Sequence, residues 1–228
     1  MFNRKFVSAV IVAAGTSSRM QSNVSKQLMN LGGRTVIENT TEKFKKCGCI
    51  DEIVVVCPPG DEDLYKDLLG DDIIVTGGGS ARQQSVFNGV SAAGADSDLI
   101  AIHDGARPLV DVDDIERVVS DGEKYGAATL AVPVKDTVKI VMEDTVAATP
   151  DRNTLYAIQT PQVFYRNDYL KAYAKAAEDN VDYTDDCQLI ESLGGTVHIT
   201  EGKYTNIKIT TPEDIDIAEV LMRRSETI

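Results

Sequence analysis

The sequence predicts an α/β fold: a Rossmann-like, mostly parallel sheet flanked by helices, with a projecting β-arm. Two observations indicate the sheet, because apolar, β-branched runs recur along the chain and amphipathic helical segments separate them. A third observation indicates the arm, since the alternation breaks at 133–163, where strands are not followed by a helix. The 228 residues suit a single domain, 1–228, with 134–157 as an inserted β-arm.

The predicted core strands are apolar throughout, as expected for strands buried on both faces of a parallel sheet. They lie within 7–15, 50–59, 71–79, 97–108 and 127–134. In such sheets ligands bind outside the carboxyl ends of the strands. Residues that directly follow these runs are therefore the first candidates for a functional site.

The predicted helices show apolar residues at helical spacing, and most of them end at or near a glycine, which is typical of a helix C-terminus. They lie within 35–48, 60–70, 81–94, 111–126 and 166–180.

The break in the alternation contains a predicted hairpin. The stretch 137–149, "TVKIVMEDTVAAT", indicates two short strands around the turn residues Glu143 and Asp144. No helix pattern follows directly, so we expect this hairpin to project from the main sheet.

The C-terminal part predicts a last pair of strands and a closing helix. The strands are expected within 195–202 and 205–210, and the helix within 211–224. Thr211 is a suitable N-cap and Pro212 a suitable first helical residue. On this interpretation Lys208 lies in the middle of a strand.

The charge balance restricts the partners. With 23 basic and 36 acidic residues, the chain has a formal net charge of −13. Such a surface repels nucleic acid backbones and anionic membranes, so neither is an expected partner. No apolar run is long enough to span a bilayer, and we expect a cytoplasmic protein. A local cluster of cations can still bind a small anion.

The four cysteines are Cys47, Cys49, Cys57 and Cys187. Their spacing is not that of a C-x-x-C motif, and the chain has two histidines to complete a metal site. We interpret them as reduced thiols, with zinc or a disulfide as the less favoured alternative.

The first strand leads into a loop suited to an anion. Gly15 ends the apolar run, small hydroxyl residues fill 16–18, and the cations Arg19 and Lys26 follow. A strand–loop–helix junction directs backbone amides at a bound anion. The loop matches neither G-x-G-x-x-G nor GxxxxGK[ST], which argues against a plain dinucleotide-binding dehydrogenase domain. A simple turn with solvated cations remains the alternative.

A set of motifs runs in order along almost the whole chain. They are "AAG…RM…K", "GGGSARQQSV", "HDGARP", "KDTVK", "DR", "QTPQ", "YTDD" and "NIKITTPEDI". Each motif alone is weak, but the ordered set closely resembles the 2-C-methyl-D-erythritol 4-phosphate cytidylyltransferase family of isoprenoid precursor synthesis.

The resemblance implies a fold of the nucleotidyltransferase type and an enzyme that uses CTP. A phosphate oxygen of methylerythritol phosphate would attack the α-phosphorus of CTP and release pyrophosphate. Arg19 and Lys26 are the catalytic residues that it implies, since cations neutralise the charge that develops in phosphoryl transfer. It also implies Mg²⁺, held mainly by the CTP phosphates, because no acidic cluster has the spacing of a metal cage.

The same resemblance assigns residues to CTP binding. Two positions depart from the family: Ser17 stands where a second glycine is usual, and Ser80 replaces an acidic residue of some relatives. The implied CTP-binding residues are Ala13, Ala14, Gly15, Gly79, Ser80, Arg82, Ser85, Asp104 and Lys208.

For the acceptor alcohol the resemblance implies Asp104, Arg107, Thr137 and Arg152. In the family the arm crosses a homodimer interface, so Thr137 and Arg152 would complete the partner's acceptor site. His103 is interpreted as a packed strand residue. Asp185 and Asp186 are interpreted as helix-capping or arm-supporting acids and are left outside the site.

Other functions remain open on the sequence. The nearest is a D-ribitol 5-phosphate cytidylyltransferase of cell-wall polymer synthesis, which shares the fold and the CTP loop. A sugar 1-phosphate nucleotidyltransferase is more distant, because the serine-lined base site and the arm argue against it. A non-catalytic nucleotide sensor could lose Lys26, Arg152 or Lys208, and this chain retains all three.

Overall fold

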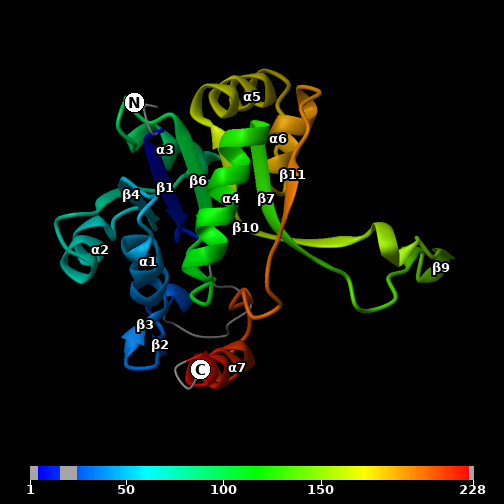
Figure 1. The fold of residues 1–228 in the computed structure, drawn as a ribbon, viewed down its shortest axis with the longest axis horizontal. Coiled ribbons are helices and arrows are strands. Elements are labelled where there is room, and N and C mark those ends of the chain that lie inside the picture. The colour runs from blue at the N-terminus through cyan, green and yellow to red at the C-terminus, as the bar shows by residue number, and fades with distance from the viewer. Residues whose placement is uncertain (1–4, 16–24, 226–228) are drawn as a thin grey trace.

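The computed structural model describes residues 5–15 and 25–225 and contains a seven-stranded sheet between two layers of helices (Figure 1). The order of the strands is β11-β7-β10-β6-β1-β4-β5. Their bounds are β1 Val7–Val12, β4 Glu52–Cys57, β5 Ile74–Gly77, β6 Leu99–Asp104, β7 Ala127–Pro133, β10 Tyr156–Tyr165 and β11 His198–Glu201.

The sheet is mostly parallel, as the sequence predicts. β1 pairs in parallel with both β4 and β6, β4 with β5, and β7 with β11. The exception is β10, which lies antiparallel between β6 and β7, so that Val163 faces Ala101 on one side and Ala128 on the other. The carboxyl ends of β1, β4, β5 and β6 therefore meet at one edge.

Six helices cover the two faces of the sheet. α1, α2 and α4 share one hydrophobic cluster with the sheet, and α3, α5 and α6 share the other. Their bounds are α1 Val36–Lys46, α2 Glu62–Leu69, α3 Arg82–Ala92, α4 Val112–Tyr125, α5 Arg166–Glu178 and α6 Cys187–Ser192.

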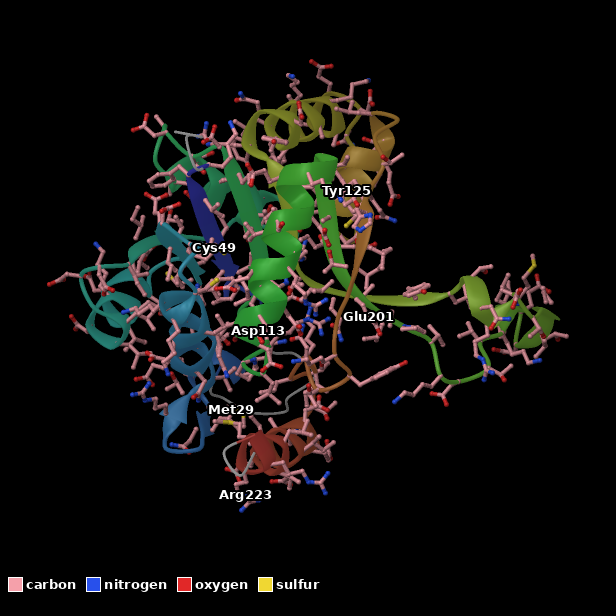
Figure 2. The ribbon with its side chains drawn as sticks, viewed as in Figure 1. Met29, Cys49, Asp113, Tyr125, Glu201 and Arg223 are labelled. Carbon is pink, nitrogen blue, oxygen red and sulfur yellow. The ribbon has the colours of Figure 1, made fainter. Side chains whose placement is uncertain are left out.

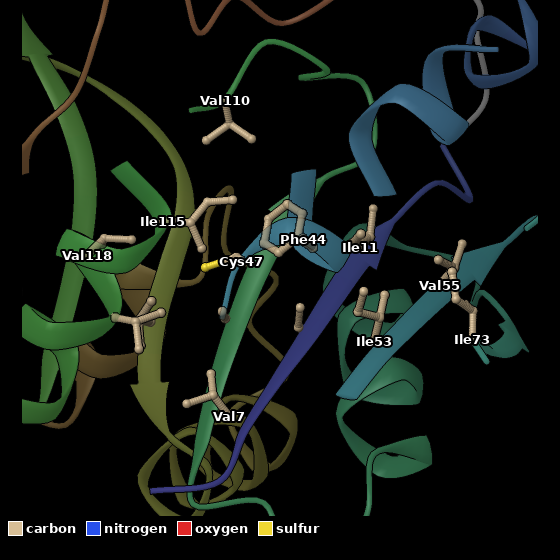
Figure 3. Close-up of a cluster of buried hydrophobic side chains, with 14 of the residues drawn as sticks. Val7, Ile11, Phe44, Cys47, Ile53, Val55, Ile73, Val110, Ile115 and Val118 are labelled. Carbon is tan, nitrogen blue, oxygen red and sulfur yellow. The ribbon is translucent and has the colours of Figure 1, made fainter. Parts of the chain in front are cut away.

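The alternation of side chains along β1 builds both cores. Val7 and Ile11 face the first cluster, where they meet Phe44 of α1 and Ile115 of α4 (Figure 3), and Val10 faces the second. Phe44 is 1% exposed, so its replacement by alanine would cost about 3–5 kcal/mol of the free energy of unfolding.

Local signals fix the ends of several helices. At the start of α1, Thr35 and Glu38 form a capping box, in which each side chain accepts a hydrogen bond from the other's backbone amide. Gly70 and Gly126 follow α2 and α4 with φ of 93° and 91°, a conformation that favours glycine. Within the described ranges, we find no helix of the length and apolarity needed to cross a membrane.

The predicted hairpin is confirmed as an arm that stands away from the body of the protein (Figure 1). β8, Ile140–Met142, pairs antiparallel with β9, Thr145–Ala148. Glu143 and Asp144 connect them with φ of 47° and 61°, so both turn residues are left-handed, as in a type I′ turn.

The side chains of the arm extend into solvent beyond Glu201 of β11 (Figure 2). Exposed apolar side chains on the arm and its root are Val138, Ile140, Val141, Met142, Val146, Tyr156 and Ile158. A single chain leaves this surface uncovered.

Several elements differ from the sequence prediction. The segment 205–210 is not a strand, because it leaves the sheet and Ile209 donates its amide hydrogen to the carbonyl of Ala106. Lys208 is therefore not mid-strand, and this expectation was wrong. The strand β10, helix α6 and a small ribbon of β2, Asn30–Leu31, with β3, Arg34–Thr35, were not predicted.

The last helix, α7, spans Glu213–Ser225, so it begins one residue after Pro212. Asp214 stabilises this start, since its carboxylate accepts hydrogen bonds from the amides of Thr210 and Thr211. Ala218 of α7 packs against Ile209 and Leu31 in a third small cluster. This contact holds the segment 205–210 against the body of the protein.

Candidate active site

A pocket of about 270 Å³ opens at the carboxyl ends of β1, β5 and β6. This is where the topology of a parallel sheet predicts a ligand site. Lys26, Arg82 and Lys208 bring three cations to its wall, and Asp104 brings one carboxylate. The lining residues are Val12, Ala14, Gly15, Lys26, Gln27, Gly79, Ser80, Ala81, Arg82, Ser85, Asp104, Ala106 and Lys208.

Two glycine-bearing loops form one side of the pocket. A Cβ added at Gly78 would lie 2.4 Å from the Cβ of Ala14, so a glycine is needed for the loop after β5 to pack on the loop after β1. Ser85 of α3 holds this arrangement, because its hydroxyl accepts a hydrogen bond from Gly79 N and donates one to Ala81 O. Ser80 donates from its amide and its hydroxyl to Gln84 Oε1.

The N-terminal loop is only partly described. Ala14, Gly15 and Lys26 line the pocket, and Lys26 begins the short 3₁₀ helix η2, Lys26–Leu28. Ala13 is buried, and its amide donates to Val56 O within the sheet, so that group is already used. The prediction for Arg19 lies outside the described residues.

Asp104 ends β6 and lies at the centre of a cluster of cations. Its carboxylate lies 2.8 Å from Lys208 Nζ, 3.5 Å from Arg107 Nε and 3.9 Å from Arg82 Nη2. Burial alone would raise the pKa of Asp104, but the attraction of Lys208, Arg82 and Arg107 outweighs burial and holds this pKa well below its usual range. Asp104 is therefore ionised at neutral pH.

Arg107 lies behind Asp104 rather than on the pocket wall. Its Nη1 donates to the carbonyl of Asn206 at 2.8 Å, and its side chain is 12% exposed. Burial lowers the pKa of Arg107, although Asp104 opposes this shift. Arg107 was predicted to bind the acceptor. In the structure its guanidinium group already contacts Asp104 and the carbonyl of Asn206, in the segment that carries Lys208.

His103 is a packed strand residue, as the sequence interpretation held. Its Nε2 donates to Arg107 O, its Nδ1 accepts from the Thr160 hydroxyl, and that hydroxyl accepts from Asp104 N. Burial lowers the pKa of His103 to about 4, so the ring is neutral at pH 7. This chain of hydrogen bonds fixes the backbone of Asp104 relative to β10.

Thr137 and Arg152 are not brought into the pocket of their own chain. Both are exposed near the two ends of the arm hairpin, where Arg152 Nη1 donates to the carbonyl of Lys135 at 2.9 Å. Lys135 lies over the ring of Tyr204, 3.4 Å from its centroid, which fixes the root of the arm to the C-terminal segment.

Sequence reasoning missed Asp186. Its carboxylate does not cap α6; it lies 2.8 Å from Arg82 Nη2 and is 1% exposed. The interpretation as a capping acid holds for Asp185, whose Oδ1 accepts from Gln188 N. The signal available in the sequence was the acidic pair in "YTDD", which does not reveal which of its members faces the arginine.

The pocket offers little protein ligation for a metal. Among the residues that the structure describes, no three histidine, cysteine or acidic side chains gather as a metal-binding group. Asp104 is the one carboxylate on the part of the pocket wall that the structure describes, and it is ionised. This donor set suits a divalent cation that takes most of its ligands from a bound phosphate chain.

A cation-lined pocket at the strand ends of an α/β sheet suits a protein class that binds nucleotide phosphates, and the nucleotidyltransferases are such a class. The model of the 2-C-methyl-D-erythritol 4-phosphate cytidylyltransferase family matches residues 7–224. The chain therefore belongs to this family of cytidylyltransferases.

Individual relatives agree. The 2-C-methyl-D-erythritol 4-phosphate cytidylyltransferase of Desulforamulus reducens is 44% identical over 223 residues, which cover 95% of both chains. That of Caldanaerobacter subterraneus is 43% identical over 96% of this chain and 99% of its own. The crystal structure of 4-diphosphocytidyl-2C-methyl-D-erythritol synthase from Anaerococcus prevotii has a TM-score of 0.87 and 36% identity, and the match covers 97% of this chain and 100% of that one.

Proposed function

We propose that this protein transfers a cytidylyl group from CTP to 2-C-methyl-D-erythritol 4-phosphate, giving 4-diphosphocytidyl-2-C-methyl-D-erythritol and pyrophosphate. The family match along residues 7–224 supports this substrate pair. The structural observation that carries the proposal is the pocket in which Lys26, Arg82 and Lys208 surround a small space beside Asp104. The reaction would supply non-mevalonate isoprenoid precursor synthesis.

The chemistry requires cations and positioning more than a general base. A phosphate oxygen of the acceptor forms a bond to the α-phosphorus of CTP, and the bond from that phosphorus to the bridging oxygen breaks. Pyrophosphate leaves with the electron pair. The attacking oxygen is already anionic, so the neutral, buried His103 is not required as a base. Lys26 and Lys208 neutralise the charge that builds on the transferring and leaving phosphates.

The two loops beside the pocket are suited to the nucleotide. Ala14, Gly15 and Gly79 line the pocket with a small side chain or none, so that a ligand can approach their backbone closely. Ser80 and Ser85 keep these loops in place through their hydrogen bonds to Gln84 and Gly79. Backbone groups held in this way can recognise the edge of a cytosine ring without a flexible side chain.

Mg²⁺ is proposed as the cofactor. Asp104 would be its protein ligand, and the triphosphate oxygens would supply most of the other ligands. When bound, the metal would reduce the negative charge on the phosphate chain and align it for in-line attack. Lys208 and Arg107, which both contact Asp104 Oδ2, would hold this carboxylate in position.

A homodimer is proposed through the arm. The arm exposes apolar side chains that a single chain leaves uncovered, among them Val141, Met142 and Val146. Arg152 and Thr137 lie on the same projection and would reach the acceptor phosphate in the pocket of the partner. A planar guanidinium suits a phosphate at such a site.

The cytoplasm is the proposed compartment. Cys47 Sγ and Cys49 Sγ lie 3.2 Å apart, which is the distance of a thiol contact and not of a disulfide bond, and thiols persist in a reducing environment.

The test is pyrophosphate release with CTP and Mg²⁺, comparing 2-C-methyl-D-erythritol 4-phosphate with D-ribitol 5-phosphate in parallel. Release with the first alcohol phosphate alone is expected. Release with the second alone would keep the fold and mechanism but move the protein to cell-wall polymer synthesis. If a protein that still binds CTP releases no pyrophosphate with either alcohol phosphate, the proposed acceptor is wrong.

A further inference from the structure

Arg82 lies between two carboxylates at the edge of the pocket. Its Nη2 is 2.8 Å from Asp186 Oδ2 and 3.9 Å from Asp104 Oδ1. The Arg82 side chain is 31% exposed and lines the pocket, whereas Asp186 is almost completely buried. The arginine therefore has one end in a buried ion pair and one side open to a ligand.

Asp186 is held from its backbone. Its amide donates to Gln162 Oε1 of β10 at 3.1 Å, and Gln162 Nε2 also reaches Asp185 Oδ2 at 3.3 Å. From the other side, Gln83, the neighbour of Arg82 on α3, accepts from Tyr183 N and donates to Val181 O. The start of α3 and the segment before α6 are thus fastened to each other beside the ion pair.

The charged groups of Arg82 and Asp186 lie close together, but no hydrogen bond fixes their relative orientation. Asp186 Oδ2 has no hydrogen bond of good geometry, although Arg82 Nη2 approaches to 2.8 Å. A bidentate fork would lock the guanidinium, whereas this contact keeps the charge of Arg82 near Asp186 and leaves it able to turn. A buried carboxylate strongly resists losing its cation, so Arg82 remains tethered while it turns.

The second carboxylate shows what this tether prevents. Asp104 already has Lys208 at 2.8 Å and Arg107 at 3.5 Å. If Arg82 were released from Asp186, Asp104 would be the nearest remaining carboxylate. A guanidinium closed onto Asp104 would cover the one acidic group on the described part of the pocket wall and withdraw a cation from the nucleotide.

We propose that Asp186 is a positioning residue, which tethers Arg82 over the nucleotide pocket and keeps it from closing onto Asp104. The proposal rests on the proposed function, because it assigns Arg82 to the binding of CTP. The alternative role for Asp186 is structural, in which the ion pair only joins α3 to α6.

The test compares wild type with Asp186→Asn, which removes the charge but keeps the size of the side chain. We expect the KM for CTP to rise about tenfold while kcat changes by less than about threefold, because a misplaced arginine weakens nucleotide binding. Asp186→Glu, which keeps the charge but shifts the carboxylate, is expected to give an intermediate KM. An unchanged KM for CTP in folded Asp186→Asn would overturn the proposal.

A double-mutant cycle separates positioning from structure. In an Arg82→Gln background, Asp186→Asn is expected to cause no further rise in the KM for CTP, since the residue through which it acts is absent. An equal further rise in that background would overturn the proposal. Asp185→Asn is the matched control: it weakens the cap of α6 and does not touch Arg82, so it is expected to lower Tm without raising the KM for CTP.

Two measurements keep the outcome decisive. If Asp186→Asn does not fold, Asp186→Ala carries the test, because it also removes the carboxylate, and a KM for CTP equal to that of wild type in folded Asp186→Ala would overturn the proposal. Calorimetric titration with CTP alone gives a Kd that does not depend on the acceptor. Absence of pyrophosphate release by wild type would sink the proposed function, whereas an equal Kd in wild type and Asp186→Asn would sink this inference.

Discussion

Lys26 begins the short helix η2 after the loop that follows β1, and its side chain lines the pocket in which the negative charge of the transferring phosphate would develop. Lys26→Ala is expected to reduce kcat about a hundredfold or more while the Kd for CTP changes much less, because the lysine acts mainly in the transition state. Pyrophosphate-release kinetics and calorimetry with CTP measure the two quantities. Lys66→Ala, at an exposed lysine of α2, is the control. Unchanged turnover in Lys26→Ala would remove this lysine from the site.

His103 makes a pH-dependent contribution to stability. Its pKa is about 4 in the folded protein because of burial and about 6.5 when unfolded. Between these values the unfolded state binds the proton and the folded state does not, so stability is lost as the pH falls through this window. We expect His103 to account for a loss of about 2 kcal/mol between pH 7.5 and 5.

Urea unfolding of wild type and His103→Gln across that range measures the effect. The variant is expected to be less stable at pH 7.5 but to show a flatter pH profile. His198→Gln, at the partly exposed second histidine, is the matched control. Equal slopes for wild type and His103→Gln would contradict the assignment.

At the scale of single residues, the sequence predicted which residues line the pocket better than it predicted which residues form ion pairs with each other. Lys26, predicted as catalytic, and Asp104 and Lys208, predicted to bind CTP, all lie on the pocket wall, and their roles stay predictions. Asp186 was missed because its partner, Arg82, lies 104 positions away along the chain, and no local pattern connects them. Long-range ion pairs follow from the fold and not from spacing.

The loop after β5 is the element in which packing most directly limits the pocket. In Gly78→Ala the added methyl would meet the Cβ of Ala14 at 2.4 Å and Ser85 Oγ at 2.9 Å, so the two loops must separate. We expect the KM for CTP to rise about tenfold. Steady-state kinetics measure this, and Gly48→Ala is the control because nothing lies within 4 Å of its added Cβ. Wild-type kinetics in Gly78→Ala would mean that the loop contact does not shape the nucleotide site.

Elements with a continuous apolar pattern were predictable, and those defined by their surroundings were not. β1, β4 and β6 have the uniform burial that an apolar run indicates. β10 carries Gln159, Thr160 and Gln162 within the sheet, where these polar groups bond to Asn206, His103 and Asp186. The sequence of this strand therefore lacks the continuous apolar pattern that predicts a buried strand. Conversely, 205–210 alternates like a strand but packs its apolar side chains against α7 and the loop after β6.

On the scale of the whole molecule, the net charge of the protein is negative, whereas the charge on the pocket wall is mainly positive. The chain carries a net charge of −13, yet among the described residues three of the four charged side chains on the pocket wall are cations. A small anion is therefore drawn by local charge against the field of the protein. The composition left a small anionic ligand possible and the motifs predicted one through their resemblance to a family, whereas the shape of the pocket could be seen only in the fold.

Whether one site draws on two chains is tested by mixing two defective variants, at a concentration of the alcohol phosphate far below the KM of Arg152→Ala. Arg152→Ala alone is expected mainly to raise the KM for the alcohol phosphate, since Arg152 lies on the arm and is absent from the pocket wall of its own chain. In a symmetric dimer that pairs Lys26→Ala with Arg152→Ala, one composite site carries both changes and the other carries neither. Half of the dimers in an equal mixture are mixed, so about a quarter of wild-type activity is expected to return.

The matched control is a mixture of Lys26→Ala with Lys208→Ala. Both lysines line the same pocket of one chain, so each site of their mixed dimer remains defective and no activity is expected to return. Native mass spectrometry of two differently tagged chains establishes the exchange of subunits. Recovery in the first mixture and not in the second would require that the arm of one chain completes the pocket of the other. If neither mixture recovers activity although subunit exchange is demonstrated, the site is confined to a single chain and Arg152 has no role in it.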